Sequence, residues 1–318
     1  MRTLTVQTAA AGALIALVLQ LTSGDAHNAA MQIGVHLVRF TGPNGPTALG
    51  PMLASVGQAA EEVGVDNLSL MDHFFQLKFL GDARDPMLEG YTTLGFLAAH
   101  TRSVQLQLAM TGVTYRHPGL LAKIVATLDC LSGGRAVLGI GAAWYEREHL
   151  GLGVPFPPVS ERFERLEETL QIVRQMWSPD DGPFHGSHYR LEETICSPQP
   201  LHRVPIMVGG EGERKTLRLV AKYGDACNVF AGRDPEHVAH KFEVLRGWCD
   251  ELGRPYDDIS RTVLYMGPVL ADPAGFLEQM HAYADVGVQA VHVVPPDDDP
   301  VEFVRGLGER VVPTLKGL

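Results

Sequence analysis

Short, continuous apolar runs alternate along the chain with longer segments whose apolar residues recur at helical spacing. Continuous apolar runs are typical of strands buried on both faces, as in a parallel sheet, and the longer segments predict amphipathic helices. From residue 32 onward, each predicted strand is followed by a predicted helix. The predicted strands comprise residues 32–38, 65–71, 104–110, 135–140, 204–208, 225–230, 259–266 and 288–294.

Several helices carry recognisable start signals. Asp234, Asp272 and Asp299 each stand directly before a proline, which is the pattern of an N-cap followed by a first helical residue. Ser160 is expected to cap a further helix through its hydroxyl group. The remaining predicted helices comprise residues 49–63, 91–101, 117–131, 160–177 and 213–223.

Eight strand–helix units in about 290 residues predict an α/β fold of the (β/α)8 TIM-barrel type. A doubly wound sheet is the less favoured alternative, because it would usually contain fewer units. Two long segments interrupt the alternation. Residues 142–159 follow the fourth strand and are rich in glycine, proline and aromatic residues, whereas residues 178–203 precede the fifth strand and can form a hairpin.

The first thirty residues stand apart from this pattern. Residues 9–21 are apolar except for one glutamine, and this run is too short to span a bilayer. With Arg2 before it and a small-x-small triplet after it, the run resembles a signal peptide, which would imply export. We favour the alternative that translation starts at Met31 and that the protein is cytoplasmic. In either case residues 1–30 are excluded from the fold, and residues 31–318 are predicted to form a single domain.

Composition narrows the range of partners. A hydrophobic content of 45% and a charged content of 20% are those of a soluble globular protein. The net charge of −11 argues against nucleic acid as the main partner, because phosphate binding needs a basic surface. The four cysteines form no CxxC pair, which disfavours a zinc site or a disulfide scaffold. We therefore expect a small-molecule substrate, no metal and no membrane contact for the barrel.

In a (β/α)8 barrel the active site is built where strands pass into helices. The sharpest pair at such a position is Asp72-His73, which follows the second strand. An imidazole exchanges protons near neutral pH, and an adjacent carboxylate can favour its charged form. An isolated Asp-His pair is more often a loop cap beside a packed histidine, but its place at a strand end favours catalysis.

Small residues follow other strands. Thr111-Gly112-Val113 either forms a turn or packs against a flat ring, and Gly139 and Gly141 either pack helices or leave room for a ring system. Gly209, Gly210 and Gly212 form a turn before a helix whose N-terminus suits a phosphate or carboxylate.

Two weaker candidates remain. His36, in the first strand, is as often a core residue as a site residue. Glu146, Glu148 and His149 lie close in sequence, where we expect a solvated helical turn rather than a metal cluster.

These segments together resemble the bacterial luciferase-like monooxygenase superfamily. The resemblance extends over about residues 31–315 and is strongest for the branch of oxidoreductases that use the deazaflavin coenzyme F420. It is carried by Asp72-His73-Phe74, Thr111-Gly112-Val113, GIGAAWY at 139–145, ERFERLEETLQIVRQMW at 161–177 and VPIMVGGEGERKTLRLVAKYGDACNVF at 204–230.

The resemblance implies a barrel that holds the coenzyme ring in its C-terminal mouth. His73 would then exchange a proton, assisted by Asp72, and the family often has a non-prolyl cis peptide at the place matched by residues 111–113. The expected coenzyme-binding residues are His36, Asp72, Thr111, Gly112, Val113, Gly141, Ala142, Ala143, Gly209, Gly210, Glu211 and Gly212. Basic residues that would meet the anionic tail of the coenzyme are Arg214, Lys215, Arg218 and Lys222.

Two positions depart from the family pattern. A glycine would be expected at Ala142 or Ala143, and the added methyl group would tighten the pocket. Glu211 stands where a small residue is common, and a carboxylate beside a phosphate is unfavourable. We therefore expect Glu211 to face solvent.

The resulting hypothesis is an F420-dependent oxidoreductase that transfers a hydride between the deazaflavin and a small organic substrate, with residues 142–159 closing over the site. One alternative is an FMN-dependent monooxygenase, which would need a separate flavin reductase. Another is a non-catalytic barrel that stores the cofactor. The resemblance also implies a homodimer. The sequence does not indicate the substrate or the direction of transfer.

Overall fold

The parallel strands of the protein surround a common axis in the computed structural model, which describes residues 30–41, 45–231, 234–296 and 299–318. The two interpretations of the N-terminal segment concern residues 1–30, which lie outside the described part of the chain except for Ala30. The strands of the main sheet are β1 (Gln32–Leu37), β2 (Asn67–Leu70), β3 (Gln105–Leu108), β4 (Thr111–Gly112), β5 (Ala136–Gly141), β8 (Ile206–Gly209), β9 (Ala226–Phe230), β10 (Ser260–Tyr265) and β11 (Ala290–Val293).

Strand pairing closes this sheet on itself. The order is β3-β2-β1-β11-β10-β9-β8-β5-β4, and an additional pairing joins β3 to β5. Because β3 and β4 both pair in parallel with β5, they are two pieces of one barrel strand. The described residues thus contain eight strand positions around the barrel, and the predicted (β/α)8 fold is confirmed.

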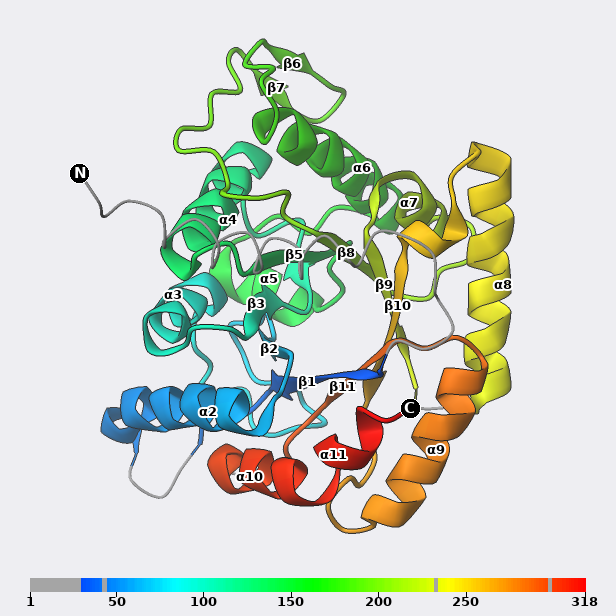
Figure 1. The fold of residues 1–318 in the computed structure, drawn as a ribbon. Coiled ribbons are helices and arrows are strands. Elements are labelled where there is room, and N and C mark those ends of the chain that lie inside the picture. The colour runs from blue at the N-terminus through cyan, green and yellow to red at the C-terminus, as the bar shows by residue number, and fades with distance from the viewer. Residues whose placement is uncertain (1–29, 42–44, 232–233, 297–298) are drawn as a thin grey trace, which may run out of the picture.

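One long helix follows each barrel strand and packs outside it (Figure 1). These helices are α2 (Leu49–Val63), α3 (Gly90–His100), α4 (Pro118–Ser132), α6 (Val159–Met176), α7 (Thr216–Tyr223), α8 (Pro235–Leu252), α9 (Pro273–Asp285) and α10 (Pro300–Arg310). Short elements are η2 (Pro46–Ala48), α5 (Glu146–Leu152), η3 (Tyr256–Asp258) and α11 (Val312–Leu315).

The three predicted Asp-Pro caps are confirmed. The carboxylates of Asp234, Asp272 and Asp299 each accept a hydrogen bond from a backbone N–H in the first turn of α8, α9 and α10. The predicted cap at Ser160 is wrong. Helix α6 begins one residue earlier, because the Pro158 carbonyl already accepts the N–H of Arg162 at 3.1 Å.

Helix α7 also begins later than predicted, at Thr216 instead of residue 213. The Gly212 carbonyl accepts the N–H of Leu217 at 3.0 Å, so residues 213–215 form a turn rather than the first helical turn.

Both interruptions of the barrel contain ordered structure. The segment before β8 forms the predicted antiparallel hairpin, β6 (Phe184–His185) and β7 (Arg190–Leu191). Figure 1 shows this hairpin beside one end of α6. The segment after β5 contains α5, which the contacts described below place over the C-terminal mouth of the barrel.

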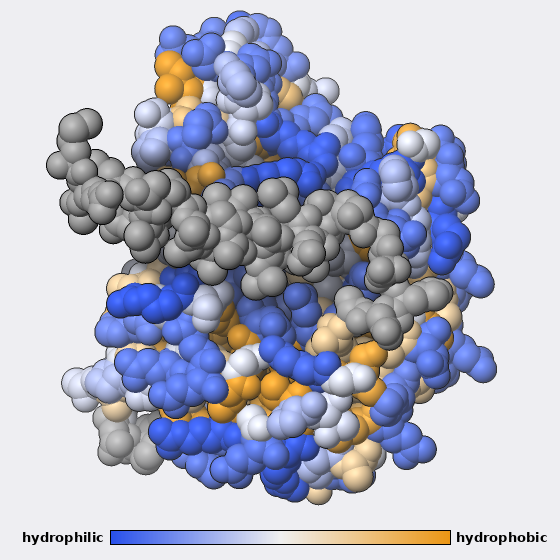
Figure 2. All heavy atoms as spheres, viewed as in Figure 1, coloured by the Kyte–Doolittle hydropathy of each residue, from blue (hydrophilic) through white to orange (hydrophobic). Residues whose placement is uncertain are grey.

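Apolar packing is concentrated between the strands and the outer helices, where one large cluster of buried side chains extends through the molecule. A small separate cluster of Val137, Met207 and Ala226 packs with Met110 in the barrel. Figure 2 shows mostly polar side chains over the helices on the visible face. Among the described residues, no helix has both the length and the apolar character needed to cross a bilayer.

Candidate active site

Asp72, directly after β2, forms a buried ion pair at the barrel mouth. Its side chain is 1% exposed and its two oxygens receive both terminal nitrogens of Arg116, at 2.7 and 2.9 Å. Asp72 Oδ2 also accepts the N–H of Gly112 at 3.0 Å, which ties the end of β2 to β4. Arg116 in turn reaches Glu89 at 2.5 Å.

The two members of this pair are perturbed in ways that follow from their burial. Burial raises the pKa of Asp72, while the Arg116 guanidinium and the Gly112 N–H oppose the rise. Although burial disfavours its cation, Arg116 has a raised pKa because of the Asp72 and Glu89 carboxylates. We expected Asp72 to assist His73, but its carboxylate is instead committed to Arg116 and to the β4 backbone.

His73 takes a different carboxylate as its partner. Its Nδ1 lies 2.6 Å from Oε1 of Glu148, a residue of α5 with 0% exposure. In the described part of the chain, no group hydrogen-bonds to His73 Nε2. The imidazole is 13% exposed and makes edge-on contacts with the rings of Trp144 and Tyr145, whose centroids lie at 5.5 and 5.7 Å. One ring nitrogen is therefore anchored and the other is left for a ligand.

Glu148 gathers hydrogen bonds from three further donors. Its Oε2 accepts the backbone N–H groups of Phe74 at 2.7 Å and Phe75 at 3.1 Å. Its Oε1 also accepts the hydroxyl of Tyr115. Although burial raises the pKa of Glu148, the hydrogen bonds from His73, Tyr115 and Phe74 outweigh this effect and lower it. Glu148 is thus a buried carboxylate that stays ionised.

His149, the neighbour of Glu148, closes the same cluster. Its Nδ1 faces the Tyr145 carbonyl at 2.9 Å and its Nε2 faces the Thr114 hydroxyl at 2.6 Å. Its ring stacks on Tyr115 with a centroid distance of 4.4 Å. The expectation of a solvated helical turn is wrong for Glu148 and His149, which are both 0% exposed because α5 packs onto the mouth.

A second histidine pair lies at the ends of β1 and β11. His36 is 3% exposed, and its Nδ1 lies 2.9 Å from the Ser69 hydroxyl. Burial, with smaller effects from His292 and His73, lowers the pKa of His36 to about 3. Burial lowers the pKa of His292 to about 4, and its Nδ1 has no partner among the described residues. Both rings are therefore neutral at physiological pH.

Residues 111–113 line the mouth through their backbone. The Thr111 hydroxyl lies 2.8 Å from the Tyr91 hydroxyl, and the Val113 N–H donates to the Gly141 carbonyl at 3.0 Å. The non-prolyl cis peptide joins Ala109 to Met110, so its expected location within residues 111–113 is wrong. The bond lies in the interval between β3 and β4.

The strand-end glycines serve two purposes. A Cβ at Gly139 would stand 2.1 Å from the Leu108 carbonyl oxygen, and one at Gly209 would stand 2.4 Å from Met110 Cγ. These two glycines therefore make room for the chain itself. Gly141 is different, because its Cβ would meet only ordinary contacts, at 3.6 Å from the Gly209 oxygen and Met110 Cβ.

Ala143, where a glycine was expected, has a φ of 61°. This left-handed conformation favours glycine and raises the energy of an alanine by about 1–2 kcal/mol. Ala142 and Ala143 are both half-buried at the mouth. The backbone thus follows a path suited to the expected glycine.

The turn after β8 combines an unusual backbone with an anchored carboxylate. Gly210 has a φ of +117°, and its N–H donates to the Asn228 carbonyl at 3.2 Å. Glu211 does not face solvent as expected. Its Oε1 accepts the N–H of Phe230 at 2.8 Å and its Oε2 lies 3.3 Å from His237, because the end of β9 presents a donor there.

The basic residues after this turn are partly occupied by other contacts. Lys222 pairs with Glu167 at 2.7 Å, and Lys215 lies over the Phe163 ring at 5.3 Å. The N–H groups of Glu211 and Gly212 donate to no group in the described residues. Backbone donors at the turn are thus better placed for an anion than Lys222 is.

The mouth fits a flat ligand with a polar ring edge and an anionic group. Unpaired polar atoms are available at His73 Nε2, at the buried Nδ1 of His292 and at the backbone N–H groups of Glu211 and Gly212. Exposed apolar side chains at strand ends supply walls, with exposures of 58% for Trp144 and 52% for Phe230. No cluster of three or more potential metal ligands occurs among the residues described.

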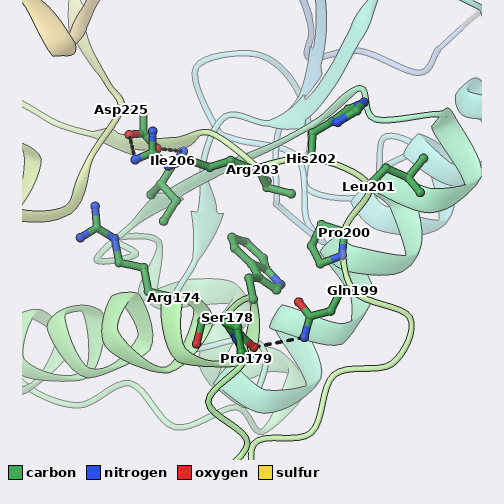
Figure 3. Close-up of a pocket in the computed structure, with 12 residues that line it drawn as sticks. Arg174, Ser178, Pro179, Gln199, Pro200, Leu201, His202, Arg203, Ile206 and Asp225 are labelled. Carbon is green, nitrogen blue, oxygen red and sulfur yellow. Dashed lines mark hydrogen bonds and ion pairs between the residues drawn. The ribbon is translucent and has the colours of Figure 1, made fainter.

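A cavity of about 790 Å³ lies at the opposite end of the barrel (Figure 3). It borders Ile206, the first residue of β8, and Asp225, which directly precedes β9. Arg203 reaches Asp225 at 2.5 Å on its wall. Its distance from the carboxyl ends of the strands separates this cavity from the histidines and carboxylates of the mouth.

Sequence reasoning identified Asp72 and His73 but missed their partners. Arg116, Tyr115 and Glu148 are contributed by the segments after β4 and β5. The clustering of Glu148 with His149 was the available signal, and sequence spacing does not show which distant residue a side chain will meet.

The chain resembles known proteins over most of its length. The sequence model described as luciferase-like monooxygenase matches residues 31–301. An F420-dependent glucose-6-phosphate dehydrogenase from Kineococcus radiotolerans is 32% identical over 260 residues, which cover 80% of this chain and 74% of the relative. A protein of the same name from Nakamurella multipartita is 26% identical over 335 residues, covering 88% of this chain and 97% of the relative.

Solved structures show the same fold. An F420-dependent secondary alcohol dehydrogenase in complex with an F420-acetone adduct superimposes with a TM-score of 0.75 at 18% identity, covering 90% of this chain and 99% of that one. The coenzyme F420-dependent tetrahydromethanopterin reductase from Methanopyrus kandleri gives a TM-score of 0.71 at 17% identity, with coverages of 90% and 99%.

Proposed function

The chain belongs to the luciferase-like monooxygenase family, and we propose on this premise that it is an oxidoreductase that uses coenzyme F420. The similarity to F420-dependent dehydrogenases supports the choice of cofactor, since both relatives described above carry this coenzyme in their names. The observation that carries the catalytic part is the anchored His73, whose Nε2 is left without a protein partner among the described residues.

The coenzyme would be held at the carboxyl ends of the strands. His36, Asp72, residues 111–113, residues 141–143 and residues 209–212 supply the predicted binding surface. Asp72 acts through Arg116 and Gly112, whose backbone it holds in place. When bound there, the deazaflavin supplies the carbon that gives or takes the hydride.

His73 manages the proton that accompanies the hydride. With Nδ1–H donated to Glu148, a neutral imidazole presents the lone pair of Nε2. When a substrate hydroxyl is oxidised, Nε2 takes its proton as the hydride leaves the adjacent carbon. In the reverse direction the imidazolium returns this proton to the forming hydroxyl. We propose a small organic substrate that carries such a hydroxyl or carbonyl group.

The segment of residues 142–159 would limit access of water to this proton transfer. Helix α5 already places Glu148 and His149 against the mouth, and Trp144 stands beside His73. We propose that this segment covers the bound coenzyme and substrate.

Coenzyme binding tests the proposal directly. Titration of the protein with F420 should give saturable quenching of the deazaflavin fluorescence, and FMN titrated in parallel should bind more weakly. Preferential binding of FMN would favour the flavin-dependent monooxygenase alternative, and no F420 binding would overturn the proposal.

A His73→Ala variant distinguishes an enzyme from a storage protein. The variant should keep F420 binding, while the rate of hydride exchange with glucose-6-phosphate or secondary alcohols as probe substrates should fall by about 10²–10⁴-fold. A storage barrel would bind F420 and show no turnover in the parent protein with any alcohol or ketone tested.

A further inference from the structure

Helix α5 brings a carboxylate to the catalytic histidine from an insertion of the barrel. Glu148 is 0% exposed, and its oxygens are the acceptors for Nδ1 of His73, the Tyr115 hydroxyl and two backbone N–H groups. A buried carboxylate without partners would be strongly disfavoured, so this set of donors is what allows an ionised group in the mouth.

The two oxygens of Glu148 are not equivalent. Oε2 is committed to the N–H groups of Phe74 and Phe75, which can only donate. Oε1 faces His73 Nδ1 at 2.6 Å. A carboxylate can only accept, so a neutral His73 must carry its proton on Nδ1 to satisfy this contact.

We propose that Glu148 is the positioning residue of the site and that it selects the His73 tautomer in which Nε2 exchanges the proton with the substrate. The inference rests on the proposed function for the role of Nε2, whereas the tautomer itself is a property of the protein alone. Tyr115 supports the arrangement because its hydroxyl donates to the same Glu148 oxygen.

The Glu148→Gln variant tests this with little change in shape. The N–H groups of Phe74 and Phe75 still require an acceptor, so the carbonyl oxygen of the introduced side-chain amide must face them. The amide NH2 group then faces His73 and donates to Nδ1, which forces the ring proton onto Nε2. We expect the substitution to switch the tautomer and to remove the lone pair from the reacting nitrogen.

Long-range ¹H–¹⁵N correlation spectra of ¹⁵N-histidine-labelled protein report the tautomer without coenzyme or substrate. The protein has 13 histidines, so the His73 signals are assigned by their loss in a His73→Gln variant. The parent protein should show Nδ1–H, and Glu148→Gln should show Nε2–H. An Nε2–H tautomer in the parent protein, or an unchanged tautomer in Glu148→Gln, would overturn the proposal.

Matched variants separate positioning from a merely structural effect. Glu146→Gln changes an exposed residue on the same helix and should keep the Nδ1–H tautomer and the parent kcat. Glu148→Asp restores the charge and should keep the tautomer with a smaller loss of kcat. Thermal unfolding followed by circular dichroism identifies any variant that fails to fold, and the Asp variant then decides the question.

Kinetics link the tautomer to the reaction. Glu148→Gln should lower kcat by about 10²–10⁴-fold while the Kd for F420 stays within a factor of a few. If F420 fails to bind the parent protein, the proposed function fails and the tautomer result still stands. If F420 binds and Glu148→Gln turns over at the parent rate, the positioning role of Glu148 is refuted alone.

Discussion

At the scale of single residues, the mouth of the barrel is organised by two carboxylates with different tasks. Asp72 is paired with Arg116 and holds the β4 backbone, whereas Glu148 is paired with His73 and holds the proton-exchanging ring. Removing one partner of a buried ion pair leaves the other uncompensated, so each pair constrains both of its members.

His36 makes stability depend on pH at this scale. Its folded-state pKa of about 3 lies below its ordinary value of 6.5, because burial, His292 and His73 disfavour the cation. The unfolded chain therefore binds a proton that the folded protein excludes. Stability is fully present above about pH 6.5 and falls progressively as the pH drops toward 3.

A His36→Asn variant should lose part of this acid sensitivity while its amide can still bond to Ser69. We expect a shallower decline of the free energy of unfolding between pH 7 and 4, measured by urea denaturation at each pH. His185→Asn removes an exposed histidine and should leave the slope unchanged. Equal slopes for the parent protein and His36→Asn would contradict the assignment.

At the scale of elements, carboxylates fasten irregular segments to helices. Glu148 on α5 accepts the backbone N–H groups after β2. Glu168 on α6 does the same for the turn of the β6–β7 hairpin, where it accepts the N–H groups of Ser187, His188 and Tyr189. A two-stranded hairpin is only marginally stable by itself, so it depends on such an anchor.

A Glu168→Ala variant should release this hairpin. Three backbone N–H groups lose their acceptor, and we expect a loss of about 1–3 kcal/mol together with faster proteolysis between β6 and β7. Glu192→Ala removes a carboxylate whose side chain is 77% exposed and whose partner is Arg190, and should change stability by less than about 0.5 kcal/mol. Unchanged proteolysis of Glu168→Ala would show that the hairpin is held by other contacts.

At the scale of the whole molecule, closure of the barrel is what assembles the site. The pairing of β3 with β5 closes the ring, and β1 pairs with both β2 and β11, which brings His36 near His73 and His292. Both of these histidines contribute to the lowered pKa of His36. The large cavity near Arg203 lies at the other end of the same barrel, away from these groups.

Residues 31–318 should fold without the N-terminal segment, since the family match begins at residue 31. A chain that starts at Met31 should show the far-UV circular dichroism, thermal unfolding midpoint and F420 affinity of the full-length protein. A lowered midpoint or weakened F420 binding would show that residues 1–30 take part in the fold or the site.

Element type and order could be predicted from the sequence because they depend on local signals. Continuous apolar runs marked the barrel strands, and Asp234, Asp272 and Asp299 marked helix starts through a cap that lies within one turn. Errors arose where a local signal competed with a nearby backbone acceptor. Pro158 started α6 before Ser160, and Gly212 kept residues 213–215 out of α7.

The partners within the site could not be predicted, because they join segments far apart in the chain. Glu148 meets His73 across 75 positions, and Arg116 meets Asp72 across 44. Glu211 was expected in solvent because no sequence pattern shows that the end of β9 offers the N–H of Phe230.

The sequence by itself therefore determined the barrel, its family and the proton-exchanging His73, since periodicity, caps and motifs are written along the chain. Only the tertiary structure decided that Glu148, rather than the adjacent Asp72, is the partner of His73. The physical reason is that a buried carboxylate is kept ionised by the donors that surround it, and those donors are brought together only when the barrel closes and α5 packs over its mouth.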